Sequence, residues 1–577
     1  MWISRVRQPA TSGVAISRRL ARSGVRPIAV LGRRNYATTE QNPSEKPSSS
    51  SLHWIKTSLG LAGTATAAFL IYTYATKGDA SKISKSFPDL SKTAEELSSD
   101  FVQQKRSLKS PGVYVWGTNV YHVVDPESKD SVVKTPRKMS YFDGQVLRDL
   151  KLGETSGAAI TEHGDLVQWG KGYSESDYKP AKTLTGKNLI SLCMSHDRIL
   201  ALSGDGKVYS LPIAMHDQLS GRKPEEGSWV PFWTGKAGVS YRVLQPSLKL
   251  GEKVTAISGG LEHILLLTSS GRVFSAASST ENFPSFGQLG IPGLTWATRP
   301  KGPVDACHEI KLPKDSKVTQ IATGEYHSLL LTKDGHVFTF GDNSFGQLGM
   351  EFDPSVPFCD TPAPVHFRNL YRGGVWHLQA TGIAAGGANS FFVVDVQHAI
   401  GHDEDPRKIS NIISDTWTCG RGIWGALGTG KWTHLQDSLT KVKALSGLVE
   451  YDENTKHIIP IRPSDISVGT THVSAVLDNK THLDAPSTST LDTANDSGLD
   501  VLWWGGNEHF QLGTGKRSNI SKPTHINIHP GAGLGDKNDL ARLQILPFHK
   551  GKVGARNVNM RQRVECGRHI SAVYSSV

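Results

Sequence analysis

Two short phrases alternate along most of this chain, and their repetition is the feature that most constrains its fold. The first is a small residue, two variable residues, often a histidine, and an apolar run, as in GEYHSLLL at residues 324–331. The second is a turn and a strand that often ends in an aromatic residue and glycine, as in TKDGHVFTFG at residues 332–341. A D-G or S-G pair between β-branched runs predicts a hairpin, because glycine adopts positive φ at little steric cost. Each copy therefore predicts paired antiparallel strands.

Each of these two phrases occurs seven times, counting looser copies. The histidine column of the first phrase contains Ser156, Arg198, His263, His327, Asn389, His472 and His569. It recurs at a period of about 60 residues with insertions, which is typical of supersecondary units that stack on their neighbours. Four copies are followed by a third phrase, of which GDNSFGQLGM at residues 341–350 is the fullest.

This order of phrases resembles the repeat of the regulator of chromosome condensation family, over residues 111–577. The resemblance implies an all-β fold, a seven-bladed β-propeller with four-stranded antiparallel blades. The region starts with a YVWG strand and ends with the run CGRHISAVY, so we expect one blade to be shared between its two ends. In the third phrase, we expect Gly341, Gly346 and Gly349 to permit tight turns and Leu348 to pack between neighbouring blades.

The N-terminal region has a different composition. Residues 1–36 hold eight arginines, no lysine and no acid, which is typical of a mitochondrial transit peptide. The run R-N-Y-A predicts cleavage between Tyr36 and Ala37. The alternative is a disordered basic tail. Removing the eight arginines from the net charge of +11 leaves about +3 on the other residues, which argues against a nucleic-acid partner.

A linker (37–56) leads to an uncharged segment at residues 57–76. Twenty residues in a helix span about 30 Å, the thickness of a bilayer's hydrocarbon core. We therefore expect a single-pass anchor in the mitochondrial inner membrane; the alternative is an apolar helix that stays in water. Residues 77–110 have partly helical spacing and are expected to form a spacer before the propeller.

No pattern in the sequence assigns chemistry. Equivalent positions around a ring do not converge on one metal, so we expect His263, His327, His472 and His569 to be structural and to bond the backbone of their own repeat. The five cysteines form no C-x-x-C pair, and the two GTGK runs lack the spacing of a phosphate loop. We assign no catalytic residue, cofactor or metal, and we expect that the chain is not an enzyme.

Function is then expected where the repeat is interrupted. The insertions are residues 212–246, 350–379, 395–415 and 479–498. The first contains four aromatic candidates for partner binding: Trp229, Phe232, Trp233 and Tyr241. The alternative is that these rings pack on their own blade. The second insertion is also aromatic, whereas the last two are charged or polar and are expected to be loops without a binding role.

The leader, the anchor and the family resemblance together imply a membrane-tethered mitochondrial scaffold for protein–protein interactions. Relatives of this type imply a role in assembling a respiratory-chain complex such as complex III, with its subunits or assembly intermediates as partners. The family also implies two alternatives, guanine-nucleotide exchange on a mitochondrial small GTPase and assembly of the mitoribosome or of RNA-associated particles. The sequence leaves open the partner's identity, the side of the membrane that the propeller faces and the oligomeric state.

Overall fold

The computed structural model describes residues 110–577, except 228–233, 315, 399–410, 453–454, 480–497 and 527–542. The predicted leader, cleavage site, linker and anchor lie outside this range, as do nearly all of the spacer and of the insertion 479–498 and more than half of 395–415. Among the described residues, none of the helices has the length and hydropathy that a bilayer span requires.

Antiparallel β-sheets make up nearly all of the described fold. Five sheets consist of consecutive strands, paired in chain order or nearly so. The first three are β7–β8–β9–β12 (Leu189–Met194, Arg198–Ser203, Val208–Pro212, Arg242–Leu244), β13–β14–β15–β16 (Val254–Gly259, His263–Thr268, Val273–Ala277, His308–Glu309) and β17–β18–β19–β20 (Val318–Thr323, His327–Thr332, Val337–Asp342, Phe358–Pro364). The other two are β21–β22–β23–β24 (Trp376–Gly386, Asn389–His398, Ile413–Gly422, Thr433–Lys441) and β27–β28–β29–β30 (Pro463–Val468, His472–Leu477, Leu499–Gly505, Ile520–Thr524), in which β31 (Gln544–Ile545) also pairs with β29.

The remaining large sheet joins the two ends of this region. One part is β3–β4–β5–β6 (Leu147–Leu152, Gly157–Thr161, Leu166–Trp169, Ala181–Lys182). The other, called the closing sheet below, contains β33 (Arg556–Cys566), β34 (Ile570–Ser576), β1 (Val113–Thr118) and β2 (Val132–Lys138), with β32 (His549–Val553) paired to β33. A single parallel bridge, Leu147 to Ser576, connects the two parts. Since β1 pairs with β34 from Val113–Tyr574 to Gly117–Ile570, the predicted sharing of one blade between the two ends is confirmed.

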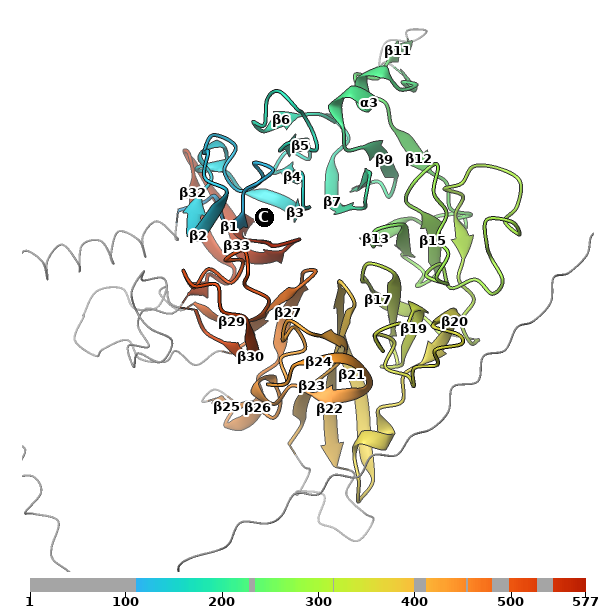
Figure 1. Cartoon of the computed structure of the whole chain (residues 1–577), viewed down its shortest axis with the longest axis vertical. Coiled ribbons are helices and arrows are strands. Elements are labelled where there is room, and N and C mark those ends of the chain that lie inside the picture. The colour runs from blue at the N-terminus through green and yellow to red at the C-terminus, as the bar shows by residue number, and fades with distance from the viewer. Residues whose placement is uncertain are drawn as a thin grey trace, which may run out of the picture. The chain divides into compact units, whose positions relative to one another are not determined.

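The sheets follow one another around a ring (Figure 1). The innermost strands contact in the order β33, β3, β7, β13, β17, β21 and β27, and β27 contacts β33 again. This arrangement is that of a β-propeller. Short elements lie between the sheets: β10–β11 (Glu225–Gly227, Thr234–Lys236), β25–β26 (Val449–Asp452, His457–Pro460), α3 (Met215–Ser220), η2 (Ser140–Phe142), η3 (Arg368–Leu370) and η4 (Lys443–Leu445).

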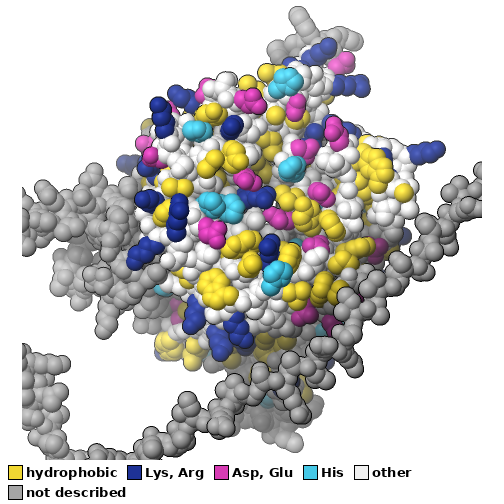
Figure 2. Space-filling model, in the orientation of Figure 1, with side chains coloured by type: hydrophobic (Ala, Val, Ile, Leu, Met, Phe, Trp, Pro, Cys, Tyr) yellow, Lys and Arg dark blue, Asp and Glu magenta, His cyan; other side chains and the backbone are white. Residues whose placement is uncertain are grey.

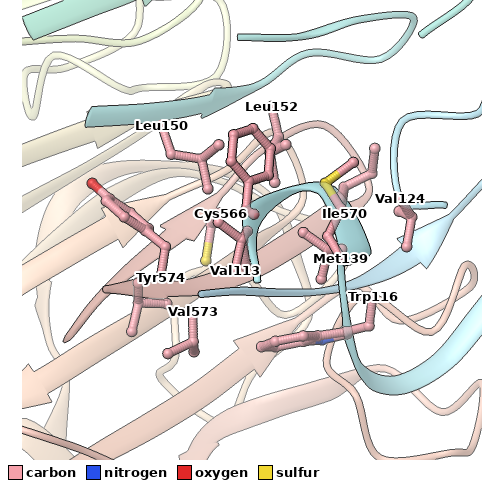
Figure 3. Close-up of a cluster of buried hydrophobic side chains, with 14 of the residues drawn as sticks. Val113, Trp116, Val124, Met139, Leu150, Leu152, Cys566, Ile570, Val573 and Tyr574 are labelled. Atoms are coloured by element: carbon pink, nitrogen blue, oxygen red, sulfur yellow. The ribbon is translucent and has the colours of Figure 1, made fainter. Parts of the chain in front are cut away.

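The apolar runs of the first phrase form the second strand of each sheet. In β8, β14, β18 and β28 every residue is buried, because these strands are covered on both faces by neighbouring sheets. The hairpins predicted after β4, β8, β14 and β18 are confirmed: Gly164, Gly206, Gly271 and Gly335 have φ between +77° and +91°. At the closure, Val113 and Trp116 from β1 pack with Ile570 and Val573 from β34 in one buried cluster (Figure 3).

Candidate functional site

Three buried histidines link neighbouring sheets. The Nε2 atoms of His263, His327 and His472 lie 2.9, 2.9 and 2.7 Å from a serine Oγ in the next sheet, that of Ser328, Ser390 and Ser571 respectively. Each serine hydroxyl donates its proton to a backbone carbonyl of the preceding sheet, that of Gln288, Gln347 or Gln511. Because the hydroxyl has one proton, the imidazole must donate from Nε2. Their Nε2 atoms thus bond serine hydroxyls of the next sheet, and the predicted partner, the backbone of the same repeat, is wrong.

Burial controls the charge of these rings. It lowers the pKa of His263, His327 and His472 to about 3, with the neighbouring His327 and His569 adding smaller effects on the first and the last. All three imidazoles are therefore neutral at pH 7. Across the described residues, no group of three or more histidine, cysteine, aspartate or glutamate side chains is arranged to hold a metal ion.

The glycine three residues before each histidine makes room for the ring. A Cβ atom built on Gly324 would lie 2.1 Å from Cε1 of His327, and one on Gly260 would lie 2.5 Å from Cε1 of His263. Real Cβ atoms do not approach other atoms this closely, so a side chain here would displace the imidazole from its serine. The G-x-x-H spacing is thus a packing requirement.

His569 does not belong to this column. The bond from Gly567 N to Ile570 O (2.8 Å) corresponds to the bond from Gly469 N to His472 O (2.9 Å). Ile570 also pairs with Gly117 as His472 pairs with Gly505. His569 precedes the strand, with φ of +60°, and its ring lies 4.7 Å from that of His509. The prediction was wrong by one residue, because this copy has a histidine just before the column position.

The third phrase packs against the following sheet, as predicted. Gly346 has φ of +79°, and a Cβ on it would lie 2.4 Å from Cα of Asp437 in β24. Leu348 is fully buried, and Gly349 has φ of +70° with Leu439 3.1 Å from the position of its Cβ. Gly341, at φ of +109°, instead faces its own sheet, where a Cβ built on it would lie 2.5 Å from Tyr326 O. The phrase therefore closes one sheet onto the next.

A cavity of about 580 Å³ lies where the inner strands converge. Its charged side chains bond across adjacent sheets: Lys151 Nζ lies 2.7 Å from Glu565 Oε2, and Arg568 lies 3.1 Å from Glu154. Asp149 accepts hydrogen bonds from Leu192 N and Ser191 Oγ of the next sheet. Burial alone would lower the pKa of Lys151, but the charges of Glu565, Asp149 and Tyr574 and the hydrogen bond to Glu565 together outweigh it, and the pKa is raised. These charges hold the ring closed.

Two cysteines also line this cavity. Burial raises the pKa of both Cys193 and Cys566 to about 12, so both thiols are protonated at neutral pH. A protonated thiol is a poor nucleophile and metal ligand. The cavity thus presents protonated thiols beside the Lys151–Glu565 and Arg568–Glu154 ion pairs.

Tyr241 is the one candidate of the first insertion that lies in the described part of the chain; Trp229, Phe232 and Trp233 lie outside it. The Tyr241 ring is buried, packs edge-on against Tyr209 at 5.3 Å, and donates from its hydroxyl to Glu226 at 2.8 Å. Tyr241 therefore packs on its own blade, which was the alternative to partner binding, and it is not available as a surface anchor. Its apolar contacts were not readable from the sequence, because Tyr209 belongs to a different strand.

The second insertion follows the same pattern. Phe367 is buried against Phe392 at 5.7 Å, and the Tyr371 hydroxyl donates to Asp415 at 2.8 Å while accepting from Trp417 Nε1. In this insertion, Phe358 is exposed at the edge strand β20. Most of its aromatic content extends the core of the β21 sheet.

Comparisons with known proteins agree with the repeat pattern. Residues 318–347 match the regulator of chromosome condensation (RCC1) repeat. "Protein FMP25, mitochondrial" of Saccharomyces cerevisiae is 25% identical over 460 residues, covering 75% of this chain and 69% of that protein. The secretion-regulating guanine nucleotide exchange factor of Bos taurus is 23% identical, covering 75% of this chain and 84% of that protein.

Two solved structures share the fold. Human WBSCR16 superposes with a TM-score of 0.51 at 17% identity, covering 81% of this chain and 99% of that chain. Prp20p of Saccharomyces cerevisiae superposes with a TM-score of 0.50 at 18% identity, covering 82% and 94% respectively. The likeness extends over about four-fifths of this chain and concerns its architecture.

Proposed function

Because the chain is a propeller of the RCC1 repeat type, we propose that its ring of seven blades is a mitochondrial scaffold for protein–protein interactions. Residues 57–76 would anchor it to the inner membrane. The observation that carries this proposal is the relation to a mitochondrial protein of yeast over three-quarters of the chain. The arginine-rich leader, with its R-N-Y-A run, supports the same compartment independently.

The use of reactive groups inside the ring supports a scaffold. The buried histidines bond serines of the next sheet, the cavity charges pair across sheets, and the thiols that line the cavity are protonated. Groups committed to holding blades together are poorly suited to acid–base or nucleophilic chemistry. Partner recognition would then use the loops at the rim of the ring.

Within this role, we favour assistance to the assembly of a respiratory-chain complex such as complex III. A tether in the inner membrane would place the propeller beside membrane-inserted subunits. Guanine-nucleotide exchange is a second candidate, favoured by the similarity to the bovine exchange factor. The two functions differ in their partner, a set of membrane subunits or a GTPase.

Affinity purification of the full chain from detergent-solubilised mitochondrial membranes tests the proposal. We expect subunits or assembly intermediates of a respiratory complex to be recovered. Recovery of ribosomal proteins alone would contradict the assembly role, and faster nucleotide release from a co-purified GTPase would favour the second candidate. Extraction with alkaline carbonate tests the anchor, since a peripheral protein would be released.

A further inference from the structure

Arg421, near the end of β23, lies over two aromatic rings. Its guanidinium carbon lies 4.7 Å from the ring centre of Phe345, in the third phrase of the preceding sheet, and 4.6 Å from that of Trp424. Contact with two rings restricts the guanidinium, which lowers the entropy lost when it binds a ligand. This arginine is therefore pre-organised.

No carboxylate pairs with Arg421 in the described part of the chain. Two other arginines of the fold, by contrast, are paired: Arg272 contacts both Glu252 and Glu309, and Arg462 contacts Asp395. The Nε atom of Arg421 is buried and has no hydrogen-bond partner. Its two Nη atoms do not share this state, since neither of them is both buried and without a partner. The bidentate side of the guanidinium thus stays available for an anion.

Apolar side chains flank this cation. Trp432 is 54% exposed and Ile423 is 42% exposed. The Trp432 ring lies over Gly425, where a Cβ would be 2.9 Å from its Cζ3. Exposed tryptophan beside arginine is the composition of interface hot spots. One side of the Trp432 ring packs on Gly425, and the rest of the ring is exposed to solvent.

Further unpaired cations continue from this point onto the β27 sheet. Lys431, Lys516, Arg517 and Lys522 are exposed, and none of them forms an ion pair with a described residue. The Lys522 side chain lies over Gly430, next to Lys431. Asp342 lies within the Phe345 phrase, but its carboxylate accepts from Ser344 N and Gln347 Nε2, and the carboxylate of Asp437 accepts from Phe352 N at 3.4 Å. The local charge is positive.

We propose that these residues, called the Arg421 patch (Arg421, Ile423, Trp424, Lys431, Trp432 and Lys522), bind an acidic segment of a partner protein. One carboxylate would pair with the Nη atoms of Arg421, an adjacent apolar side chain would pack on Trp432, and further carboxylates would meet the two lysines. The proposal rests on the proposed function as a scaffold and specifies its recognition site. A fork-shaped, stacked guanidinium matches a carboxylate in bidentate geometry.

Charge distribution favours a protein segment over nucleic acid. The face in Figure 2 carries acidic, basic, histidine and hydrophobic side chains interspersed, without a continuous basic surface. Outside the arginine-rich leader the chain carries about +3. A nucleic-acid strand needs several successive phosphate contacts, whereas a short acidic segment needs a local cluster.

The test uses the full chain in detergent and three fluorescent probes. They are an eight-residue peptide of Glu, Asp, Leu and Phe, its Gln/Asn counterpart, and a single-stranded oligouridylate of 12 nucleotides. We expect the acidic peptide alone to bind by anisotropy, and Arg421→Gln to weaken it at least tenfold. Trp432→Ala should weaken it several-fold, and Lys431→Glu/Lys522→Glu should abolish it while admitting a lysine-rich peptide.

The matched control is Arg299→Gln. Arg299 also stacks on an exposed tryptophan, Trp296, at 4.3 Å, but lies in the β13 sheet region outside the patch. We expect its affinity for the acidic peptide to stay within twofold of the unmodified chain. Trp432 and the two lysines are exposed, so their variants keep the test valid if Arg421→Gln does not fold.

Equal binding of the acidic peptide by Arg421→Gln and by the unmodified chain would overturn the proposal, as would preferential binding of the oligouridylate. Absence of peptide binding to the unmodified chain would overturn it as well. The scaffold function is judged separately by the purification from membranes. If partners are recovered equally with Arg421→Gln and Trp432→Ala, the scaffold stands and the Arg421 patch is not its recognition site.

Discussion

Ser390 is the residue at which the bonding between sheets can be tested most directly. Its hydroxyl accepts from His327 Nε2 at 2.9 Å and donates to Gln347 O at 2.6 Å, and both the histidine and the serine are fully buried. Ser390→Val removes the hydroxyl with little change in volume. The equivalent position in the β27 sheet, Val473, already carries valine.

The expected cost follows from the two groups that lose their partner. A buried donor or acceptor left unsatisfied costs about 1–3 kcal/mol, so the sum would be about 2–6 kcal/mol. The carbonyl of Gln347 keeps one weak donor, because Cys419 Sγ lies 3.4 Å away. We therefore expect Ser390→Val to lower the free energy of unfolding by about 3 kcal/mol.

A double-mutant cycle separates the bond from other effects of the substitution. His327→Asn combined with Ser390→Val reproduces the pair Asn389 and Val473, which the next junction carries. We expect the double variant to lose about 1–2 kcal/mol less than the sum of the single variants. Urea unfolding at pH 7.5, followed by tryptophan fluorescence, measures all three. A loss below about 0.5 kcal/mol for Ser390→Val, or strict additivity, would refute the role of this hydroxyl.

Three further predictions follow from the same geometry. The pKa of the three buried histidines is about 3 in the folded protein against 6.5 in the unfolded chain, so the folded protein is most stable above pH 6.5 and loses stability as pH falls. At pH 5.5 the loss is about 1.4 kcal/mol for each histidine, and the midpoint of urea unfolding should fall accordingly. A variant with asparagine at all three positions should flatten this dependence of the midpoint on pH. Gly324→Ala places a Cβ against His327 and should cost several kcal/mol, about 3 or more, in the same unfolding assay, whereas Gly238→Ala, with no atom within 4 Å, should be near neutral. Lys151→Met leaves Glu565 unpaired between β3 and the closing sheet and should cost about 3 kcal/mol, with Lys151→Met/Glu565→Met regaining most of it in a thermal melt; an unchanged midpoint for the single variant would contradict the closing role of the pair.

The elements that sequence predicts well are those set by near neighbours in the chain. Hairpins appear where Gly164, Gly206, Gly271 and Gly335 give the backbone positive φ, and the shared closing sheet follows from which phrase comes first and which last. Both depend on local order along the chain. The direction of an aromatic side chain does not: Tyr241 was as consistent with a surface anchor as with the core position that it occupies.

The partners of the histidines could not be read from a single repeat. Ser390 is separated from His327 by 63 residues, and Ser571 from His472 by 99. The pairing can be recognised only when the ring order of the sheets is known. The histidine at the column position of one sheet bonds the serine that follows the column position in the next sheet. His569 was misassigned for a related reason: β34 begins at Ile570, and only its pairing with β1 fixes that register.

Junctions that lack the histidine show how the ring tolerates irregular repeats. Where the column residue is Asn389 or Ile570, the following sheet has Val473 or Gly157 in place of serine.

At both of these junctions a tryptophan donates to the carbonyl of the preceding phrase: Trp504 Nε1 to Ala426 O at 2.7 Å, and Trp169 Nε1 to Val123 O at 2.8 Å. Trp116 Nε1 makes the same bond to Gln511 O at 2.8 Å beside the His472–Ser571 pair. At Gly157 no side chain could be accommodated, since a Cβ would lie 2.3 Å from the Trp169 ring. These junctions and the His327–Ser390 junction therefore use different residues to bond a buried backbone carbonyl of the preceding phrase. Since closure requires agreement only between adjacent sheets, the rim loops are free to differ from blade to blade.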